Sequence, residues 1–245
     1  MSDWLFDLGN SRFKAAPLRD DGQVGAVRVW AHGAERLEQG GPALPDGATA
    51  WLASVASPAL TAQVVDALAA RFARVELIRV EAECAGVRIA YADPARFGVD
   101  RFLALLAAHA LGGPALVVGV GTALTIDLLD ASGRHHGGRI AASPTVMRQA
   151  LQARAAQLPA SGGRYSEFAD DTADALASGC DGAAVALVER SLDQGRRLLG
   201  TQPVLLLHGG GAPDLSPLLP QAHPQPTLVL DGLAAWTRWA RRPRG

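Results

Sequence analysis

The segment from Asp7 to Lys14 brings together the kinds of group that bind phosphate. Gly9 has no side chain, so backbone N–H groups around it could approach phosphate oxygens closely. Asn10 and Ser11 add hydrogen-bond donors, Asp7 could hold Mg²⁺, and Lys14 supplies a positive charge. Taken alone, the pattern is better interpreted as a hairpin turn with a hydrogen-bonded aspartate, so it needs support from elsewhere in the chain.

A second turn, in the segment 117–127, repeats the plan of strand, glycine turn and strand. Aligning the two segments pairs three positions: Gly9 with Gly121, Asn10 with Thr122, and Asp7 with Gly119. Two phosphate-sized turns that face each other would clamp a nucleotide. The repeat therefore predicts an internal duplication with two lobes, 1–108 and 109–245.

A third glycine turn, Gly209–Gly211, follows the apolar run 204–207 directly. Bare backbone at the end of a buried strand could admit a flat adenine or a ribose, although a plain strand-to-helix turn would look the same. The chain has neither Walker-A spacing nor a Gly-x-Gly-x-x-Gly segment that opens a helix, which disfavours P-loop and Rossmann nucleotide sites.

Asp100 and Arg101 are a second kind of chemical pair. A carboxylate can accept a hydroxyl proton, and a neighbouring guanidinium can hold a carboxylate substrate. Without further motifs, an acid in the first turn of a helix beside a solvated arginine would explain the pair equally simply.

Short apolar runs alternate with segments of helical spacing, which favours an α/β fold. Strands are expected at 4–6, 13–16, 51–55, 75–80, 115–118, 124–129 and 204–207. Helices are expected at 60–72, 100–111, 146–158 and 171–199, with turns or loops at 94–98, 133–138 and 160–163.

The composition limits the possible partners. The 245-residue chain is 49% hydrophobic, with 23 basic and 24 acidic residues and a formal net charge of −1, so no nucleic-acid or membrane partner is expected. It has no secretory signal, and no apolar run reaches the roughly 20 residues needed to cross a bilayer, which predicts a cytoplasmic protein. We expect Cys84 and Cys180 to be buried thiols and His135–His136 to lie in a solvated turn. We expect the basic run 238–244 to be a solvated helix end.

Five motifs together resemble, in order and spacing, those of type III pantothenate kinases, a family that includes proteins named Bvg accessory factor. They are Asp7–Lys14, Gly98–Arg101, Gly121–Asp127, Gly137–Ile140 and Thr172–Gly179. The resemblance implies a duplicated ribonuclease-H-like fold of the actin, hexokinase and Hsp70 superfamily, and a homodimer with a shared active site. It also implies ATP-dependent phosphorylation of pantothenate, the first step of coenzyme A synthesis.

The resemblance also implies roles for single residues. ATP would contact Asp7, Leu8, Gly9, Asn10, Ser11, Arg12, Phe13, Lys14 and Thr122, with Asp7 near Mg²⁺. Pantothenate would contact Tyr91, Gly98, Val99, Asp100, Arg101 and Thr172. Asp100 would be the general base.

Three positions depart from the family pattern. Gly119 stands where the family usually has an aspartate that resembles a ligand for K⁺ or NH₄⁺, Ala142–Ser143 replaces Pro-Gly, and His208 replaces a threonine. A carboxylate contributes charge that glycine cannot replace. We therefore expect weaker dependence on a monovalent cation, and more cation stimulation in a Gly119→Asp variant.

Two alternatives stay open at this point. One is another reaction of the same superfamily, such as sugar phosphorylation or polyphosphate hydrolysis. The other is a catalytically weakened or silent homologue that acts as an accessory, nucleotide-binding protein. This alternative stays open because Gly119 replaces the aspartate that the family usually has. An enzyme is favoured by the retained motif residues, which are Asp7, Lys14, Asp100, Arg101, Thr122 and Thr172.

Overall fold

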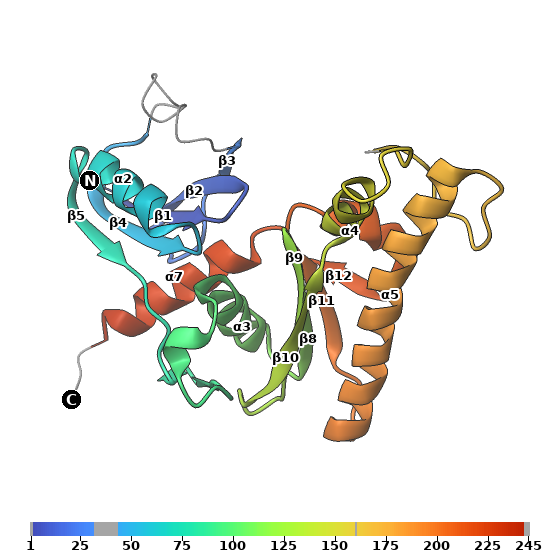
Figure 1. The fold of residues 1–245 in the computed structure, drawn as a ribbon. Coiled ribbons are helices and arrows are strands. Elements are labelled where there is room, and N and C mark those ends of the chain that lie inside the picture. Colours follow the sequence, from blue (N-terminus) through green and yellow to red (C-terminus); the bar gives the residue numbers. More distant parts are fainter. Residues whose placement is uncertain (1, 32–43, 160, 243–245) are drawn as a thin grey trace. The chain divides into compact units, whose positions relative to one another are not determined.

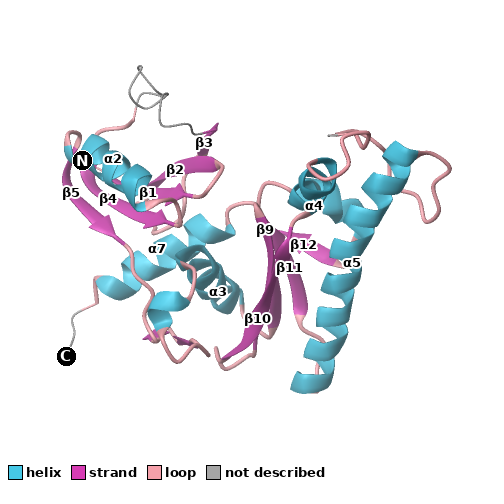
Figure 2. Cartoon of the chain, viewed as in Figure 1, coloured by secondary structure: helices cyan, strands magenta, loops and turns pink. Residues whose placement is uncertain are grey.

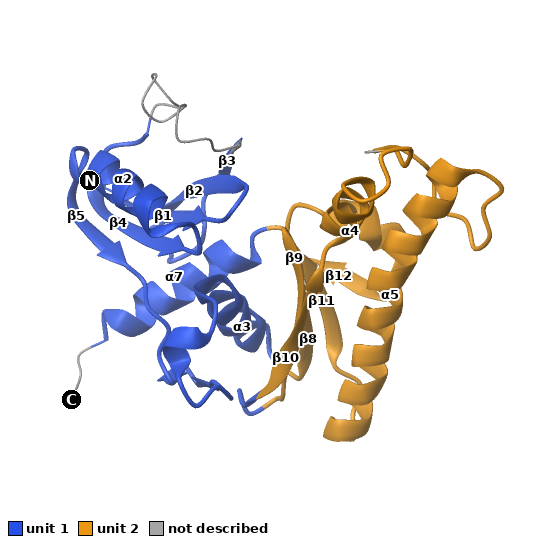
Figure 3. Cartoon of the chain, in the orientation of Figure 1, with its two compact units in different colours: residues 1–112, 132–135, 227–245 blue, residues 113–131, 136–226 orange. Residues whose placement is uncertain are grey.

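The computed structural model describes residues 2–31, 44–159 and 161–242, and confirms the expected α/β class (Figures 1 and 2). Contacts divide the chain into two compact units (Figure 3). Unit 1 consists of residues 1–112, 132–135 and 227–245, and unit 2 of residues 113–131 and 136–226. This division follows spatial contacts, whereas the boundary at 108/109 follows the sequence repeat and stays a prediction.

Each unit holds one five-stranded sheet. Unit 1 has β1 (Asp3–Leu8), β2 (Arg12–Leu18), β3 (Arg28–Ala31), β4 (Gly47–Ser54) and β5 (Phe72–Leu77). Unit 2 has β8 (Ala115–Val120), β9 (Ala123–Leu129), β10 (His135–Ala142), β11 (Val204–His208) and β12 (Ala222–Pro224).

The two sheets share one topology. Their strand orders are β3-β2-β1-β4-β5 and β10-β9-β8-β11-β12, so the strands correspond one to one. The first two strands of each sheet, β1–β2 and β8–β9, pair antiparallel. The pairs β1–β4, β4–β5, β8–β11 and β11–β12 are parallel. The internal duplication predicted from the glycine turns is thus confirmed at the level of strand order and direction.

Helices cover both faces of the unit 1 sheet. On one face, Trp4, Phe6 and Leu8 form a buried cluster with Val64 and Leu68 of α2 (Pro58–Ala69). Because alternate residues of a strand point to opposite faces, Leu5 and Asp7 face the other side. The helices α3 (Val99–Leu111) and α7 (Leu228–Ala240) pack against that side of β1 and β4.

The helices α3 and α7 approach each other closely. A Cβ atom on Gly232 of α7 would lie 1.8 Å from the backbone oxygen of Leu103 in α3, so only glycine fits at this crossing. The helix end also packs into unit 1: Arg241 forms an ion pair with Asp3 and lies over the Trp51 ring, 5.4 Å from its centroid. Arg241 stays exposed to solvent while it makes these contacts, and residues 243–244 of the basic run lie outside the described residues.

The core of unit 2 lies between its sheet and the long helix α5 (Thr172–Leu199). Leu116, Val118 and Val120 of β8 pack with Ala184 and Val188 of α5. The remaining short elements of the chain are β6 (Glu83–Cys84), β7 (Val87–Arg88), η1 (Pro94–Arg96), α4 (Pro144–Gln152), α6 (Ala212–Leu215) and η2 (Ser216–Leu218).

Several predicted boundaries are wrong. The helix expected over 60–72 ends at Ala69, and Phe72 begins β5, where it packs edge-on against Phe6 at a centroid distance of 5.6 Å. The turn expected at 133–138 is largely strand β10, and the helix expected over 146–158 begins at Pro144 and ends at Gln152. Ala160, in the expected loop 160–163, lies outside the described residues.

Within the described residues, no helix combines the length and apolar character needed to cross a membrane. Both cysteines are buried, as predicted. Burial, with a smaller effect of Glu81, raises the pKa of the Cys84 thiol to about 12, so it stays protonated.

Candidate active site

The first glycine turn joins β1 to β2 in unit 1. The Gly9 N–H donates to the Arg12 carbonyl at 3.0 Å and closes the turn, in which Asn10 and Ser11 are exposed. The side chains of Leu8 and Phe13 are buried in the core. These two residues can therefore take part in binding only through their backbone.

Asp7 and Lys14 lie side by side on the two strands of this hairpin. They pair in register, and they point to the same face of the sheet. Burial raises the pKa of Asp7 to about 6, which the positive charge of Lys14 opposes and the negative charge of Asp100 reinforces. Asp7 and Asp100 are far apart in sequence. In the fold they lie close enough for the negative charge of Asp100 to raise the pKa of Asp7.

Gly98 and Asp100 form the start of α3. Gly98 is the N-cap, and the Arg101 N–H donates to Asp100 Oδ1 at 2.8 Å. A Cβ atom on Gly98 would lie 2.7 Å from that same oxygen. Because Gly98 has no side chain, the Asp100 carboxylate has room to turn back toward the first turn of α3. The side chain of Val99 is buried.

Arg101 is buried among aromatic rings. Its side chain is only 6% exposed, and its guanidinium carbon lies 4.5 Å from the Phe97 ring centroid and 5.9 Å from that of Tyr91. Its Nη1 donates to the Tyr91 hydroxyl at 3.4 Å. The alternative of a solvated arginine is therefore wrong, and Arg101 contacts Tyr91, whose role toward pantothenate stays a prediction.

Two members of this cluster were not identified from the sequence. His135 stacks near Tyr91 and Phe97, with centroid distances of 6.3 and 5.1 Å, and its Nδ1 accepts the Ala90 N–H at 3.4 Å. His135 is buried, so the prediction of a solvated histidine turn is wrong. Phe97 could have been identified from its position directly before the Gly98–Arg101 motif. No residue near His135 in the sequence indicates that it lies beside Tyr91.

The second glycine turn joins β8 to β9 in unit 2. The Gly121 N–H donates to the Ala123 carbonyl at 2.9 Å, and Thr122 is exposed at the tip of the turn. The third turn follows β11, where the Gly211 N–H donates to Val120 at 2.9 Å. The second and third turns therefore lie at the carboxyl ends of the neighbouring parallel strands β8 and β11.

All three departures from the family pattern lie in unit 2. Gly119 and His208 are direct neighbours on β8 and β11. Ser143 is buried and caps α4, because its hydroxyl accepts the Val146 N–H at 3.4 Å. Replacing Pro-Gly by Ala142–Ser143 therefore supplies a helix cap.

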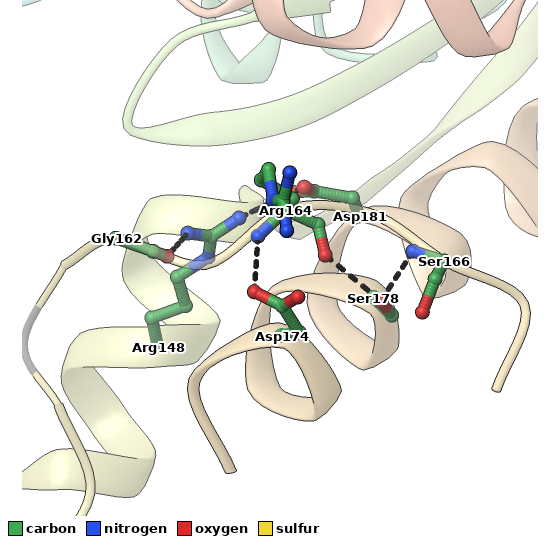
Figure 4. Close-up of polar contacts among 7 residues, drawn as sticks. All are labelled: Arg148, Gly162, Arg164, Ser166, Asp174, Ser178 and Asp181. Atoms are coloured by element: carbon green, nitrogen blue, oxygen red, sulfur yellow. Dashed lines mark hydrogen bonds and ion pairs between the residues drawn. The ribbon is translucent and has the colours of Figure 1, made fainter. Parts of the chain in front are cut away.

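Thr172 is exposed at the start of α5, beside a loop that is bound firmly to that helix (Figure 4). Arg148 makes a bidentate pair with Asp181 at 2.8 and 2.9 Å and donates to the Gly162 carbonyl at 3.1 Å. The Arg164 N–H donates to Asp174 at 2.7 Å. Gly162 and Arg164 of this loop are thus tied to α4 and α5.

The comparisons with known proteins agree with this arrangement. A family model described as type III pantothenate kinase matches residues 4–194. A type III pantothenate kinase from Stenotrophomonas maltophilia (strain R551-3) is 69% identical over 237 residues, which make up 96% of this chain and 97% of the relative. The chain belongs to the type III pantothenate kinase family. Another member, from Xanthomonas euvesicatoria pv. vesicatoria (strain 85-10), is 64% identical over 244 residues and covers 99% of this chain and 100% of its own.

Solved structures place this type III pantothenate kinase family member in a wider fold group. A Campylobacter jejuni protein described as a Baf family transcriptional activator superposes with a TM-score of 0.64 at 19% identity, over 96% of this chain and 97% of its own. A Sinorhizobium meliloti protein described as a 2-dehydro-3-deoxygalactonokinase superposes with a TM-score of 0.53 at 18% identity, over 98% and 99% of the two chains. The chain therefore shares its overall α/β fold with these two proteins.

Proposed function

We propose that this chain transfers the γ-phosphoryl group of ATP to the hydroxyl of pantothenate and forms 4′-phosphopantothenate. The observation that carries the proposal is the start of α3, where the Asp100 carboxylate lies beside the buried Arg101. A buried guanidinium attracts a substrate carboxylate more strongly than a solvated one, because less water screens the pair. The family membership supports the same reaction.

The chemistry follows from these positions. Asp100 accepts the proton of the pantothenate hydroxyl while that oxygen forms a bond to the γ-phosphorus. The bond between the γ-phosphorus and the bridging oxygen breaks, and ADP leaves. The exposed turn at Asn10 and Ser11 binds and orients the polyphosphate together with Lys14.

A divalent cation fits the acidic groups of unit 1. The pKa of Asp7 is raised both by burial and by the charge of Asp100, and a bound cation would relieve both effects. Asp7 would hold Mg²⁺ together with ATP oxygens, and the ion would supply charge stabilisation for phosphoryl transfer.

Dependence on K⁺ or NH₄⁺ is proposed to be weak because Gly119 has no carboxylate. A cytoplasmic location belongs to the same proposal.

We also propose a homodimer in which Thr172 of one subunit completes the pantothenate site of the other. Thr172 begins α5, and the loop just before it carries Phe168, whose side chain is 99% exposed. A large apolar side chain that is almost fully exposed suits a protein interface better than open water.

The reaction is tested by replacing Asp100 with asparagine. We expect Asp100→Asn to lower turnover with pantothenate, ATP and Mg²⁺ by about 10² or more while the protein stays folded. Asp93→Asn is the matched control, because the exposed Asp93 only caps η1 through the Ala95 N–H and asparagine preserves that bond. Near-normal turnover in folded Asp100→Asn would remove this residue from the mechanism.

A further inference from the structure

His208 lies against Gly119 at the ends of two parallel strands in unit 2. Gly119 of β8 pairs in register with His208 of β11 on one side and with Thr125 of β9 on the other. A Cβ atom on Gly119 would lie 2.7 Å from Thr125 Oγ1 and 2.9 Å from His208 Nε2. The imidazole therefore occupies the space that the side chain of any larger residue at position 119 would need.

The corresponding position in unit 1 has the opposite arrangement. There Asp7 of β1 pairs with Ala53 of β4 and with Lys14 of β2. The shared strand order makes β1 equivalent to β8 and β4 equivalent to β11. Unit 1 thus has a larger residue beside an alanine, and unit 2 has a glycine beside a histidine. A basic side chain flanks this position in both units, but Lys14 comes from β2, the equivalent of β9, whereas His208 comes from β11, the equivalent of β4.

His208 is also held firmly at its strand end. Gly209, the next residue, has a φ of 98°, and a Cβ atom there would lie 2.4 Å from the Val120 carbonyl oxygen. The Gly211 N–H donates to that same oxygen. This close packing holds the backbone after His208 in place, at the edge where parallel sheets bind their ligands.

Charged groups are few at this edge. His208 is the one basic residue in the segments 119–125 and 208–214, and Asp214 is the one acidic residue. The acidic Asp127 of β9 pairs with Val117 and so lies further from the strand ends. A phosphate at these turns would meet backbone N–H groups and one imidazole.

We propose that His208 is a phosphate-binding residue, which donates a hydrogen bond from its imidazole to the polyphosphate of the bound nucleotide. Gly119 is the residue that makes room for it. A hydrogen bond to an ionised phosphate is stronger than a neutral one, so the loss of this contact is measurable. The inference rests on the proposed function in taking ATP as the nucleotide.

Calorimetric binding of ATP and of adenosine to the full chain, without pantothenate, tests the contact. We expect His208→Gln to weaken ATP binding about tenfold or more and to leave adenosine binding unchanged. Gly119→Ala, which displaces the imidazole without removing it, should act in the same direction. His223→Gln is the matched control, because His223 is an exposed residue of β12 and should leave both affinities unchanged.

Two results would overturn the proposal. Unchanged ATP affinity in folded His208→Gln would exclude a phosphate contact. Equal losses of affinity for ATP and adenosine would show that His208 maintains the shape of the turn and does not contact phosphate. Wild-type turnover with pantothenate is measured separately. Its absence would count against the proposed reaction and not against the role of His208, because the binding experiment contains no pantothenate.

Discussion

Gly119 and His208 are neighbours on the parallel strands β8 and β11, and the His208 Nε2 lies 2.9 Å from where a Cβ atom on Gly119 would begin. Two of the three positions at which this chain departs from the family pattern are therefore one structural feature. An aspartate at position 119 would have to displace the imidazole, or else form an ion pair with it.

This relationship changes what is expected of Gly119→Asp. The sequence alone predicts that the added carboxylate increases stimulation by K⁺ or NH₄⁺. In the structure, His208 occupies the adjoining space, so we now expect little gain from the single variant and a clear gain from Gly119→Asp combined with His208→Thr. Initial rates across a K⁺ titration at constant ionic strength measure both. Equal stimulation of the single and double variants would show that His208 does not control this site.

Gly98→Ala tests how closely the start of α3 positions Asp100. The added Cβ atom would lie 2.7 Å from Asp100 Oδ1, so the carboxylate must move while the helix can still form. We expect turnover to fall about tenfold or more, because a general base acts only within hydrogen-bonding reach of its proton. Gly182→Ala is the control, since its Cβ atom would make an ordinary contact of 3.6 Å with Tyr165. Equal rates in the two variants would contradict the positioning role.

Asp7→Asn should separate activity from stability. The pKa of Asp7 is raised to about 6, chiefly by burial, so protonated Asp7 favours the folded state. That contribution is fully present below the unfolded pKa of 3.8 and is lost as pH rises through about 6. Without nucleotide and Mg²⁺, Asp7→Asn should therefore be more stable than wild type at pH 8, on the order of 1–2 kcal/mol, although inactive.

Urea unfolding from pH 4 to pH 8 in the presence of a chelator measures this difference. The stability advantage of Asp7→Asn should shrink toward pH 4, where the wild-type carboxyl is largely protonated. A difference that stays constant across this range would show that ionisation of Asp7 is not its cause.

The proposed shared active site predicts complementation between two inactive variants. In a heterodimer of Asp100→Asn and Thr172→Ala subunits, one of the two sites keeps both intact residues. Random mixing of equal amounts should therefore restore about a quarter of the wild-type activity, whereas each variant alone stays low. Light scattering checks the dimer. A monomer with full activity, or mixtures no more active than their components, would rule out sharing.

The amino-acid sequence by itself determined the local features. The glycine turns after Asp7 and after Gly119, and the helix that begins beside Asp100, depend on residues close together in the chain, and the structure contains all three. The repeated strand–turn–strand pattern also predicted the duplication, because hairpin pairing follows from the turn and the adjoining apolar runs.

Only the tertiary structure decided which distant side chains meet. His135 joins Tyr91 and Phe97 around Arg101, although no local pattern connects them. Likewise, His208 covers Gly119 only because β11 pairs with β8 in one particular register. The register of parallel strands is set by the packing of the whole sheet against its helices, and a one-residue slip would turn every side chain to the other face. That long-range packing is why the contacts of His208 could not be derived from its neighbours in sequence.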